Sequence, residues 1–207
     1  MINVTSNVNR IAEAIHEARE SRDRLLIGIA GAPGSGKSTL AQEVSRRLTQ
    51  QKVFNAVVPM DGFHLDNVVL EARGLIGRKG APETFDSMGF LTAMRRLREG
   101  QEVVLPIFDR TRDLAVAGAL VVPADCPVVI VEGNYLMFDE RPWSLLADLW
   151  NISVRLDVPQ ADLRARLIQR WLSHGLSRAA ATQRAERNDI PNAQRVMEKA
   201  LSSDIVL

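Results

Sequence analysis

A glycine-rich segment followed by a lysine and two hydroxyl residues carries the clearest chemistry in the sequence. Residues 31–38 read GAPGSGKS and match the phosphate-loop pattern G-x-x-x-x-G-K-[ST]. We expect its glycines to adopt positive φ, which turns backbone N–H groups toward phosphate oxygens. An ordinary strand-to-helix turn with fortuitous glycines is the alternative. The motif predicts a nucleoside triphosphate site formed by Gly31, Ala32, Pro33, Gly34, Ser35, Gly36, Lys37, Ser38 and Thr39.

The side chains at the end of this motif suit a triphosphate and its metal ion. We expect Lys37 to reach the β- and γ-phosphates, Ser38 to offer its hydroxyl to Mg²⁺, and Thr39 to contact another phosphate. No cluster of histidine and cysteine has the spacing of a zinc site. ATP and Mg²⁺ are therefore the cofactors that the sequence predicts.

Two acidic residues stand where apolar, strand-like runs end, at Asp61 and Glu132. Ligands of parallel α/β sheets collect at the carboxyl ends of the strands, so both carboxylates should project toward the phosphates. We assign Asp61 as the general base on an acceptor hydroxyl and Glu132 as the acid near Mg²⁺ or the substrate. Together with Ser38 they are the predicted metal contacts. The two roles are exchangeable, and a turn at Asp61 or a helix cap at Glu132 is the structural alternative.

These residues need a framework, and apolar runs alternate with helical patterns along the whole chain. Strands are expected at residues 25–30, 55–60, 103–108, 128–132, 152–158 and 204–207. Helices are expected at residues 8–18, 37–48, 87–99 and 159–202, a functional loop or short helices at 62–86, and an excursion or hairpin at 111–124. The alternation predicts one α/β domain over residues 1–207, a P-loop fold whose parallel sheet has helices on both faces.

The last predicted helical region is rich in arginine, with eight arginines and four acids between residues 155 and 195. Arg166 and Arg170 are four residues apart and share a helix face. A solvated helix face is the alternative, but beside a phosphate loop we expect these guanidinium groups to neutralise the transferring phosphoryl group. The three tryptophans are predicted to pack rather than to stack on a base, at Trp143, Trp150 and Trp171.

Composition excludes several other classes of protein. Lys and Arg total 26 against 25 Asp and Glu, and this near-neutral balance gives no global field for nucleic acid or an anionic membrane. No apolar run approaches the roughly 18 residues of a membrane-spanning helix. The single cysteine, Cys126, excludes an internal disulfide and fits a reducing cytoplasm. We expect a cytoplasmic protein, and a homodimer is left open because no interface can be read from one chain.

Beyond the phosphate loop, the sequence resembles the superfamily of uridine kinase, phosphoribulokinase and bacterial pantothenate kinase. The residues that carry the resemblance to pantothenate kinase are Asp61-Gly62-Phe63, Asn67, Val69-Leu70, Arg73-Gly74-Leu75, Lys79-Gly80, Pro82-Glu83 and Asp86. Residues 132–136 and 188–192 look more like a smaller group of kinases described as fructose-transport-system or nucleoside/nucleotide kinases. The similarity covers most of the chain from Leu25 onward.

This resemblance implies an ATP-dependent kinase that acts on a hydroxyl of a small metabolite, with a sugar or nucleoside as acceptor. Pantothenate is the alternative acceptor. Pantothenate kinases carry tyrosine and histidine where this chain has Phe108-Asp109-Arg110, so two of their substrate contacts would be missing here. The resemblance further implies a lid over about residues 159–190 that includes Arg166 and Arg170. The substrate contacts it predicts are His64, Lys79, Asp109, Arg110, Asn134, Tyr135, Asn188 and Asn192. A hydrolysing P-loop switch and a nucleotide-binding regulator without turnover are the competing functions.

Overall fold

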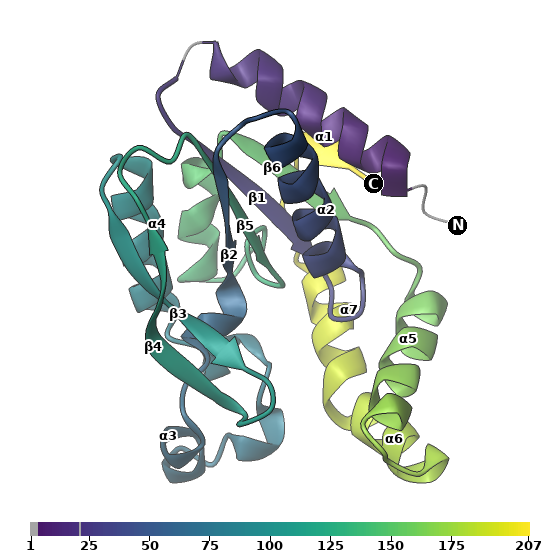
Figure 1. Ribbon diagram of the computed structural model, residues 1–207. Helices are drawn as coiled ribbons and strands as arrows, with labels where there is room; N and C mark the ends of the chain where they lie inside the picture. Colours follow the sequence, from purple (N-terminus) through teal and green to yellow (C-terminus); the bar gives the residue numbers. More distant parts are fainter. Residues whose placement is uncertain (1–3, 21) are drawn as a thin grey trace.

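A five-stranded parallel sheet forms the centre of the structure, a computed structural model that describes residues 4–20 and 22–207 (Figure 1). Its strands are β1 (Leu25–Gly31), β2 (Asn55–Pro59), β5 (Val128–Gly133), β6 (Ile152–Leu156) and β7 (Ile205–Val206). They lie in the order β2-β5-β1-β6-β7, and each neighbouring pair is parallel. The predicted parallel α/β sheet is confirmed.

Helices surround this sheet. The α-helices are α1 (Val4–Arg19), α2 (Lys37–Gln50), α3 (Asn67–Ala72), α4 (Ser87–Arg98), α5 (Gln160–Ser173), α6 (Arg178–Arg184) and α7 (Ile190–Glu198). Shorter turns of 3-10 helix are η1 (Met60–Phe63), η2 (Ile76–Arg78), η3 (Pro82–Thr84) and η4 (Trp143–Leu149), and η5 (Ala185–Asp189) is a π-helix. The region 159–202 is thus interrupted rather than one helix, because the chain turns at Gly175 with a φ of 85°.

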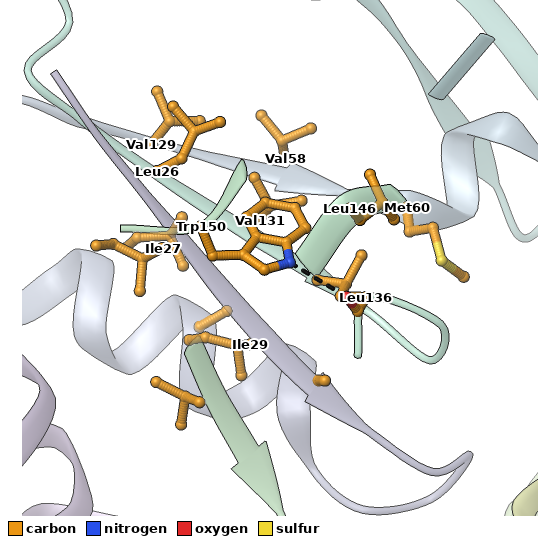
Figure 2. Close-up of a cluster of buried hydrophobic side chains, with 14 of the residues drawn as sticks. Leu26, Ile27, Ile29, Val58, Met60, Val129, Val131, Leu136, Leu146 and Trp150 are labelled. Atoms are coloured by element: carbon orange, nitrogen blue, oxygen red, sulfur yellow. Dashed lines mark hydrogen bonds between the residues drawn. The ribbon is translucent and has the colours of Figure 1, made fainter. Parts of the chain in front are cut away.

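Both faces of the central strand β1 are buried, as its unbroken apolar sequence predicts. Ile27 and Ile29 lie on one side of the strand, and Leu26 and Trp150 lie on the other (Figure 2). The Trp150 indole packs so closely on Gly28 that a Cβ atom there would lie 2.7 Å from the ring. Trp150 also donates from Nε1 to the Leu136 carbonyl over 3.1 Å, so its predicted packing role is confirmed.

The register of the sheet brings the ends of three strands to one level. Ile29 of β1 and Pro59 of β2 are both opposite Glu132 of β5. The phosphate loop therefore leaves the same sheet edge at which Glu132 lies, and Asp61 follows two residues after Pro59. The prediction that Asp61 and Glu132 lie near the phosphate loop assumes that the strands end at the same level, and the register shows that they do.

The two segments that the sequence left open have defined structures. Residues 62–86 contain α3, η2 and η3, so the short-helix alternative is right for that stretch. β3 (Val103–Asp109) and β4 (Leu114–Val122) pair antiparallel as a separate two-stranded sheet, so the second segment forms a hairpin with the predicted strand before it. In Figure 1 this hairpin and α3 stand on one side of the molecule, while α5 and α6 project on the other.

Candidate active site

Most of the predicted site residues gather in one cleft of about 960 Å³. Its lining residues come from α3 and the β3–β4 hairpin on one side and from α5 and α6 on the other. Figure 1 shows these two groups of elements on opposite sides of the molecule. The predicted residues that line it are Pro33, Gly34, Gly36, Lys37, Ser38, Thr39, Asp61, His64, Lys79, Arg110, Asn134, Arg166, Arg170 and Asn192. The predicted residues outside its lining are Gly31, Ala32, Ser35, Asp109, Glu132, Tyr135 and Asn188.

The phosphate loop has the geometry that binds an anion. Gly34 and Gly36 have φ values of 81° and 95°, which confirms the positive φ expected at these two positions. Gly36 is also the N-cap residue directly before α2, and no side chain caps that helix end. Uncapped N–H groups and the positive end of a helix dipole are the groups that phosphate oxygens bind. The loop therefore fits the triphosphate of ATP.

Gly31 differs from the expectation of positive φ. It is the last residue of β1 and is absent from the described glycines with positive φ. A Cβ atom at Gly31 would lie 2.5 Å from Ser35 Oγ, so the glycine is needed because the loop folds back closely on the strand. The Ser35 hydroxyl itself is buried.

Glu132 lies behind the phosphate loop and is only 6% exposed. Burial raises the pKa of Glu132, and the charge of Lys37 and a hydrogen bond from Ser38 act in the opposite direction. The carboxylate is thus placed beside the two side chains expected to meet phosphate and Mg²⁺. Among the described residues, no three His, Cys, Asp or Glu side chains form a metal site. An ion held at Ser38 and Glu132 would need phosphate oxygens as further ligands.

Asp61 lies in η1, directly after β2, and faces the cleft. Its Oδ2 accepts from Arg110 Nη2 over 2.7 Å, so the hairpin supplies a cation to this carboxylate. The neighbouring Gly62 is held against the hairpin, because a Cβ atom there would lie 2.2 Å from the Pro106 carbonyl oxygen. The Asp-Gly pair thus forms part of the η1 turn, and that turn is packed tightly against the β3–β4 hairpin.

His64 is half-buried beside Asp61, next to the rings of Phe85 and Phe108. Its Nδ1 lies 2.8 Å from the Asp61 carbonyl oxygen, and its ring centroid is 4.0 Å from that of Phe85 and 4.7 Å from that of Phe108. Burial lowers the pKa of His64, although the charge of Asp61 and its carbonyl oppose the shift. Since a carbonyl only accepts, the neutral ring donates through Nδ1 and leaves Nε2 as an acceptor.

Lys79 comes from the segment after η2, and its side chain is 11% exposed. Its Nζ lies 2.7 Å from Asn67 Oδ1, 2.8 Å from the Asp113 carbonyl oxygen and 2.9 Å from Asp113 Oδ2. The ammonium also stands 5.1 Å from the centroid of the Phe108 ring. Asp113 holds a left-handed backbone with a φ of 55° at the hairpin turn. We name Asn67, Lys79 and Asp113 the lysine cluster.

The two residues after Gly133 have different surroundings. Asn134 lines the cleft, and its buried Oδ1 has no hydrogen-bond partner among the described residues. Tyr135 is fully buried, and its hydroxyl donates to the Gly80 carbonyl over 2.6 Å. Burial raises the pKa of Tyr135. Tyr135 thus supports the Lys79–Gly80 segment from within the core.

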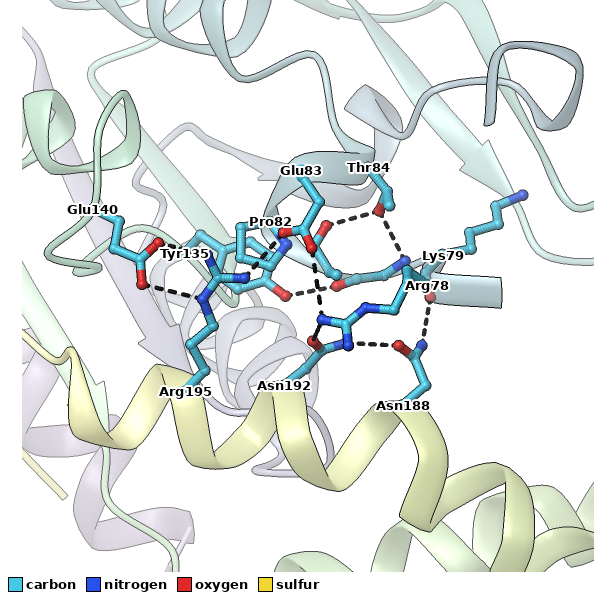
Figure 3. A network of polar contacts seen from close by, with 12 residues as sticks. Arg78, Lys79, Pro82, Glu83, Thr84, Tyr135, Glu140, Asn188, Asn192 and Arg195 are labelled. Carbon is cyan, nitrogen blue, oxygen red and sulfur yellow. Dashed lines mark hydrogen bonds and ion pairs between the residues drawn. The ribbon is translucent and has the colours of Figure 1, made fainter. Parts of the chain in front are cut away.

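Asn188 and Asn192 join the C-terminal helical region to the same segment (Figure 3). Asn188 is 1% exposed and donates from Nδ2 to the Lys79 carbonyl over 2.8 Å. Asn192 donates in turn to Asn188 Oδ1 over 3.3 Å. One turn further along, Arg195 pairs with Glu83 over 3.0 Å. Asn188 is therefore a scaffold contact, while Asn192 reaches the cleft.

The remaining predicted residues divide between the cleft and the hairpin turn. Arg166 donates from Nη1 to the Ser35 carbonyl over 3.2 Å, so α5 touches the phosphate loop directly. Arg170 lines the cleft one turn later. Asp109, by contrast, accepts from Arg112 Nε over 2.7 Å and from backbone N–H groups of its own turn. It stabilises the hairpin turn outside the cleft.

Several residues outside the predicted site also line the cleft, among them Asp113, Trp171, Arg184 and Asp189. Arg184 lies with its guanidinium carbon 5.2 Å from the Trp171 ring centroid, and Asp189 accepts from Trp171 Nε1 over 2.5 Å. Trp171, predicted only to pack, therefore also faces the cleft. Sequence reasoning missed Arg184 because the turn at Gly175 separates it from the helix of Arg166. It missed Asp113 because the position of this residue depends on how the β3–β4 hairpin folds.

Comparison with known proteins points to one family. Residues 26–206 match the family described as "Phosphoribulokinase / Uridine kinase family". The chain is 37% identical to "Uncharacterized protein YggC" of Escherichia coli (strain K12) over 89% of this chain and 77% of that protein. It is 34% identical to "Putative uridine kinase C227.14" of Schizosaccharomyces pombe over 92% of this chain and 86% of that one.

A solved structure shares both sequence and fold. It is named as a "putative fructose transport system kinase" from Silicibacter sp. TM1040 and superposes with a TM-score of 0.92 at 48% identity, covering 97% of this chain and 98% of that one. Bacterial proteins named pantothenate kinase also match, and the chain spans about half of their length. Within the described residues, no helix is long and apolar enough to cross a membrane.

Proposed function

Since the chain belongs to the phosphoribulokinase and uridine kinase family, and is thereby an ATP-dependent small-molecule kinase, we propose that it phosphorylates a hydroxyl of a sugar or a nucleoside. The single observation that carries the proposal is the cleft, because it contains the phosphate loop, Asp61 and the α5 arginines together. The names of the relatives support a sugar or nucleoside acceptor. Phe108-Asp109-Arg110 in place of the tyrosine and histidine of pantothenate kinases argues against pantothenate.

In the proposed reaction the acceptor hydroxyl oxygen attacks the γ-phosphorus of ATP. The bond from that phosphorus to the β–γ bridging oxygen breaks, ADP leaves with the bond electrons, and the hydroxyl proton passes to the Asp61 carboxylate. Lys37 and the arginines Arg166 and Arg170 offset the charge on the phosphoryl oxygens. Mg²⁺ bound at Ser38 and Glu132 would neutralise phosphate charge when present. Arg110 holds the Asp61 carboxylate in position.

The test is ADP release with ATP and Mg²⁺ across a panel of sugars, nucleosides and pantothenate. We expect turnover that depends on a sugar or nucleoside, and a loss of about 10²- to 10⁴-fold in kcat for Asp61→Asn with ATP affinity kept within twofold. Asp125→Asn removes an exposed carboxylate outside the cleft and is the matched control. Near-normal turnover of Asp61→Asn would remove Asp61 from the reaction. ADP release that no acceptor increases would instead favour the hydrolysing switch.

A further inference from the structure

The two walls of the cleft carry opposite charge. The wall of α5, α6 and η5 presents Arg166, Arg170 and Arg184 against one acid, Asp189. The facing wall, which we name the acceptor wall, comprises the cleft residues of 61–80 and of the β3–β4 hairpin. Its charged members are the acids Asp61, Glu71 and Asp113 and the cations Lys79 and Arg110. The excess of positive charge that suits a polyphosphate therefore lies on the wall of α5, α6 and η5 and at Lys37 of the phosphate loop.

Both cations of the acceptor wall are already engaged. The three N–H donors of the Lys79 ammonium face three acceptor atoms of Asn67 and Asp113 at 2.7 to 2.9 Å, which is its full capacity. Arg110 is paired with Asp61 over 2.7 Å. Turning Arg110 toward an anionic ligand would leave the Asp61 carboxylate without its cation. An anion at this wall would thus find no free donor on Lys79 and would compete with Asp61 for Arg110.

The hairpin turn places Asp113 over the lysine cluster. Asp113 adopts a φ of 55°, a left-handed conformation that asparagine and aspartate accept more readily than other non-glycine residues. In that conformation both its carbonyl oxygen and its carboxylate lie on Lys79, and its Oδ2 also accepts from Asn67 Nδ2 over 3.0 Å. The turn thus supplies two of the three acceptors that occupy the Lys79 ammonium.

The groups that remain available on this side of the cleft are mostly hydrogen-bond acceptors and ring faces. Glu71 offers carboxylate oxygens, and Asn134 presents a buried Oδ1 without a protein partner. His64 adds Nε2 as an acceptor beside the ring of Phe108. Hydroxyl groups donate to such atoms, whereas carboxylate and phosphate groups only accept.

We infer that the acceptor is an uncharged polyhydroxyl compound. The ion pair with Asp113 neutralises Lys79, and this pair disfavours acceptors that bear a carboxylate or a phosphate. The inference rests on the proposed function and narrows its substrate class. Anionic compounds that share the hydroxyls of a good acceptor are expected to be poor acceptors, because the acceptor wall carries three carboxylates against two cations that are both paired with carboxylates.

The experiment compares matched acceptors that differ by one anionic group. Glycerol is paired with glycerate, pantothenol with pantothenate, and fructose with fructose 6-phosphate, and kcat/KM is measured for each with saturating ATP. We expect the neutral member to be favoured at least about tenfold in each pair that reacts. Preference for the anionic members would overturn the inference while leaving the kinase proposal intact. Turnover with none of these compounds, nor with uridine, would overturn the proposed function and this inference together.

Asp113→Asn tests this ion pair itself, since asparagine also tolerates a left-handed backbone and still accepts from Lys79. Removing this charge leaves Lys79 unneutralised, so the ratio of neutral to anionic kcat/KM should fall at least about tenfold. Asp125→Asn again serves as the control, and its ratio should stay that of the wild type. An unchanged ratio for Asp113→Asn would overturn the assignment of Lys79 and Asp113 as the discriminating pair.

Discussion

At the scale of single residues, Glu132 shows how a buried carboxylate affects both stability and activity. Burial raises its pKa, so the folded protein retains this proton to higher pH than the unfolded chain does. The stabilising contribution is present below the ordinary carboxyl pKa of 4.5 and is lost as the pH rises through the raised value. At pH 8 the ionised side chain therefore destabilises the ligand-free protein.

Replacing Glu132 by Gln should raise the Tm of the ligand-free protein at pH 8 by about 2–4 °C, which corresponds to about 1 kcal/mol for a chain of this size. The gain should shrink toward zero at pH 4.5, as calorimetry at both pH values will measure. The same variant should lose about 100-fold in kcat. Glu17→Gln removes an exposed carboxylate of α1 and should show neither effect. A Tm difference that is negative at pH 8, or equal at both pH values, would contradict this account.

At the scale of elements, the sequence predicted what depends on local pattern, and it missed what depends on contacts between distant elements. Unbroken apolar runs located β1 and β5, and the glycine motif located the loop, because these signals lie within one segment. The direction of Tyr135 into the core and the placement of Asp113 over Lys79 follow from the packing of segments about 30 to 55 residues apart. No local pattern carries that information.

The π-helix η5 is an element whose role emerges only from such contacts. Asn188 within it holds the Lys79 carbonyl, and the adjacent Asp189 holds Trp171 of the lid. Since π-helices occur frequently at functional sites, η5 is placed to link the lid to the acceptor wall. Asn188→Ala would leave the carbonyl without this buried donor, at a cost of about 1–3 kcal/mol. We expect the KM of the acceptor to rise about tenfold while the KM of ATP changes less than twofold, as initial rates will measure.

Glu186→Gln provides the control within the same π-helix, because among the described residues Glu186 pairs with the exposed Arg164 and neither side chain lines the cleft. Its two KM values should stay near those of the wild type. A merely structural role for Asn188 would raise both KM values together or lower the amount of folded enzyme, and either result would refute the positioning role.

At the scale of the whole molecule, stability is distributed unevenly between the sheet and the lid. The main core joins the sheet to α1, α2 and α4, whereas the lid has a small cluster of its own formed by Leu167, Ala185 and Ile190. Segments with few buried apolar contacts open at low free energy. Arg166 already touches the phosphate loop, and Arg170 and Arg184 line the cleft, so a bound triphosphate would add contacts that hold the predicted lid closed. Ligand should therefore stabilise the lid more than the sheet.

Hydrogen exchange followed by mass spectrometry measures this difference directly. With saturating ATP and Mg²⁺, amides of residues 160–189 should exchange at least about tenfold more slowly, because ligand present at 100 times its Kd contributes about 2.7 kcal/mol to the bound form. Amides of β1 and β5 should change little on the same timescale, since only global unfolding exposes them. Lys37→Met should abolish the protection and Lys199→Met, exposed near the end of α7, should retain it. Equal protection of the lid in Lys37→Met would contradict this account, because it would show that the nucleotide closes the lid without Lys37.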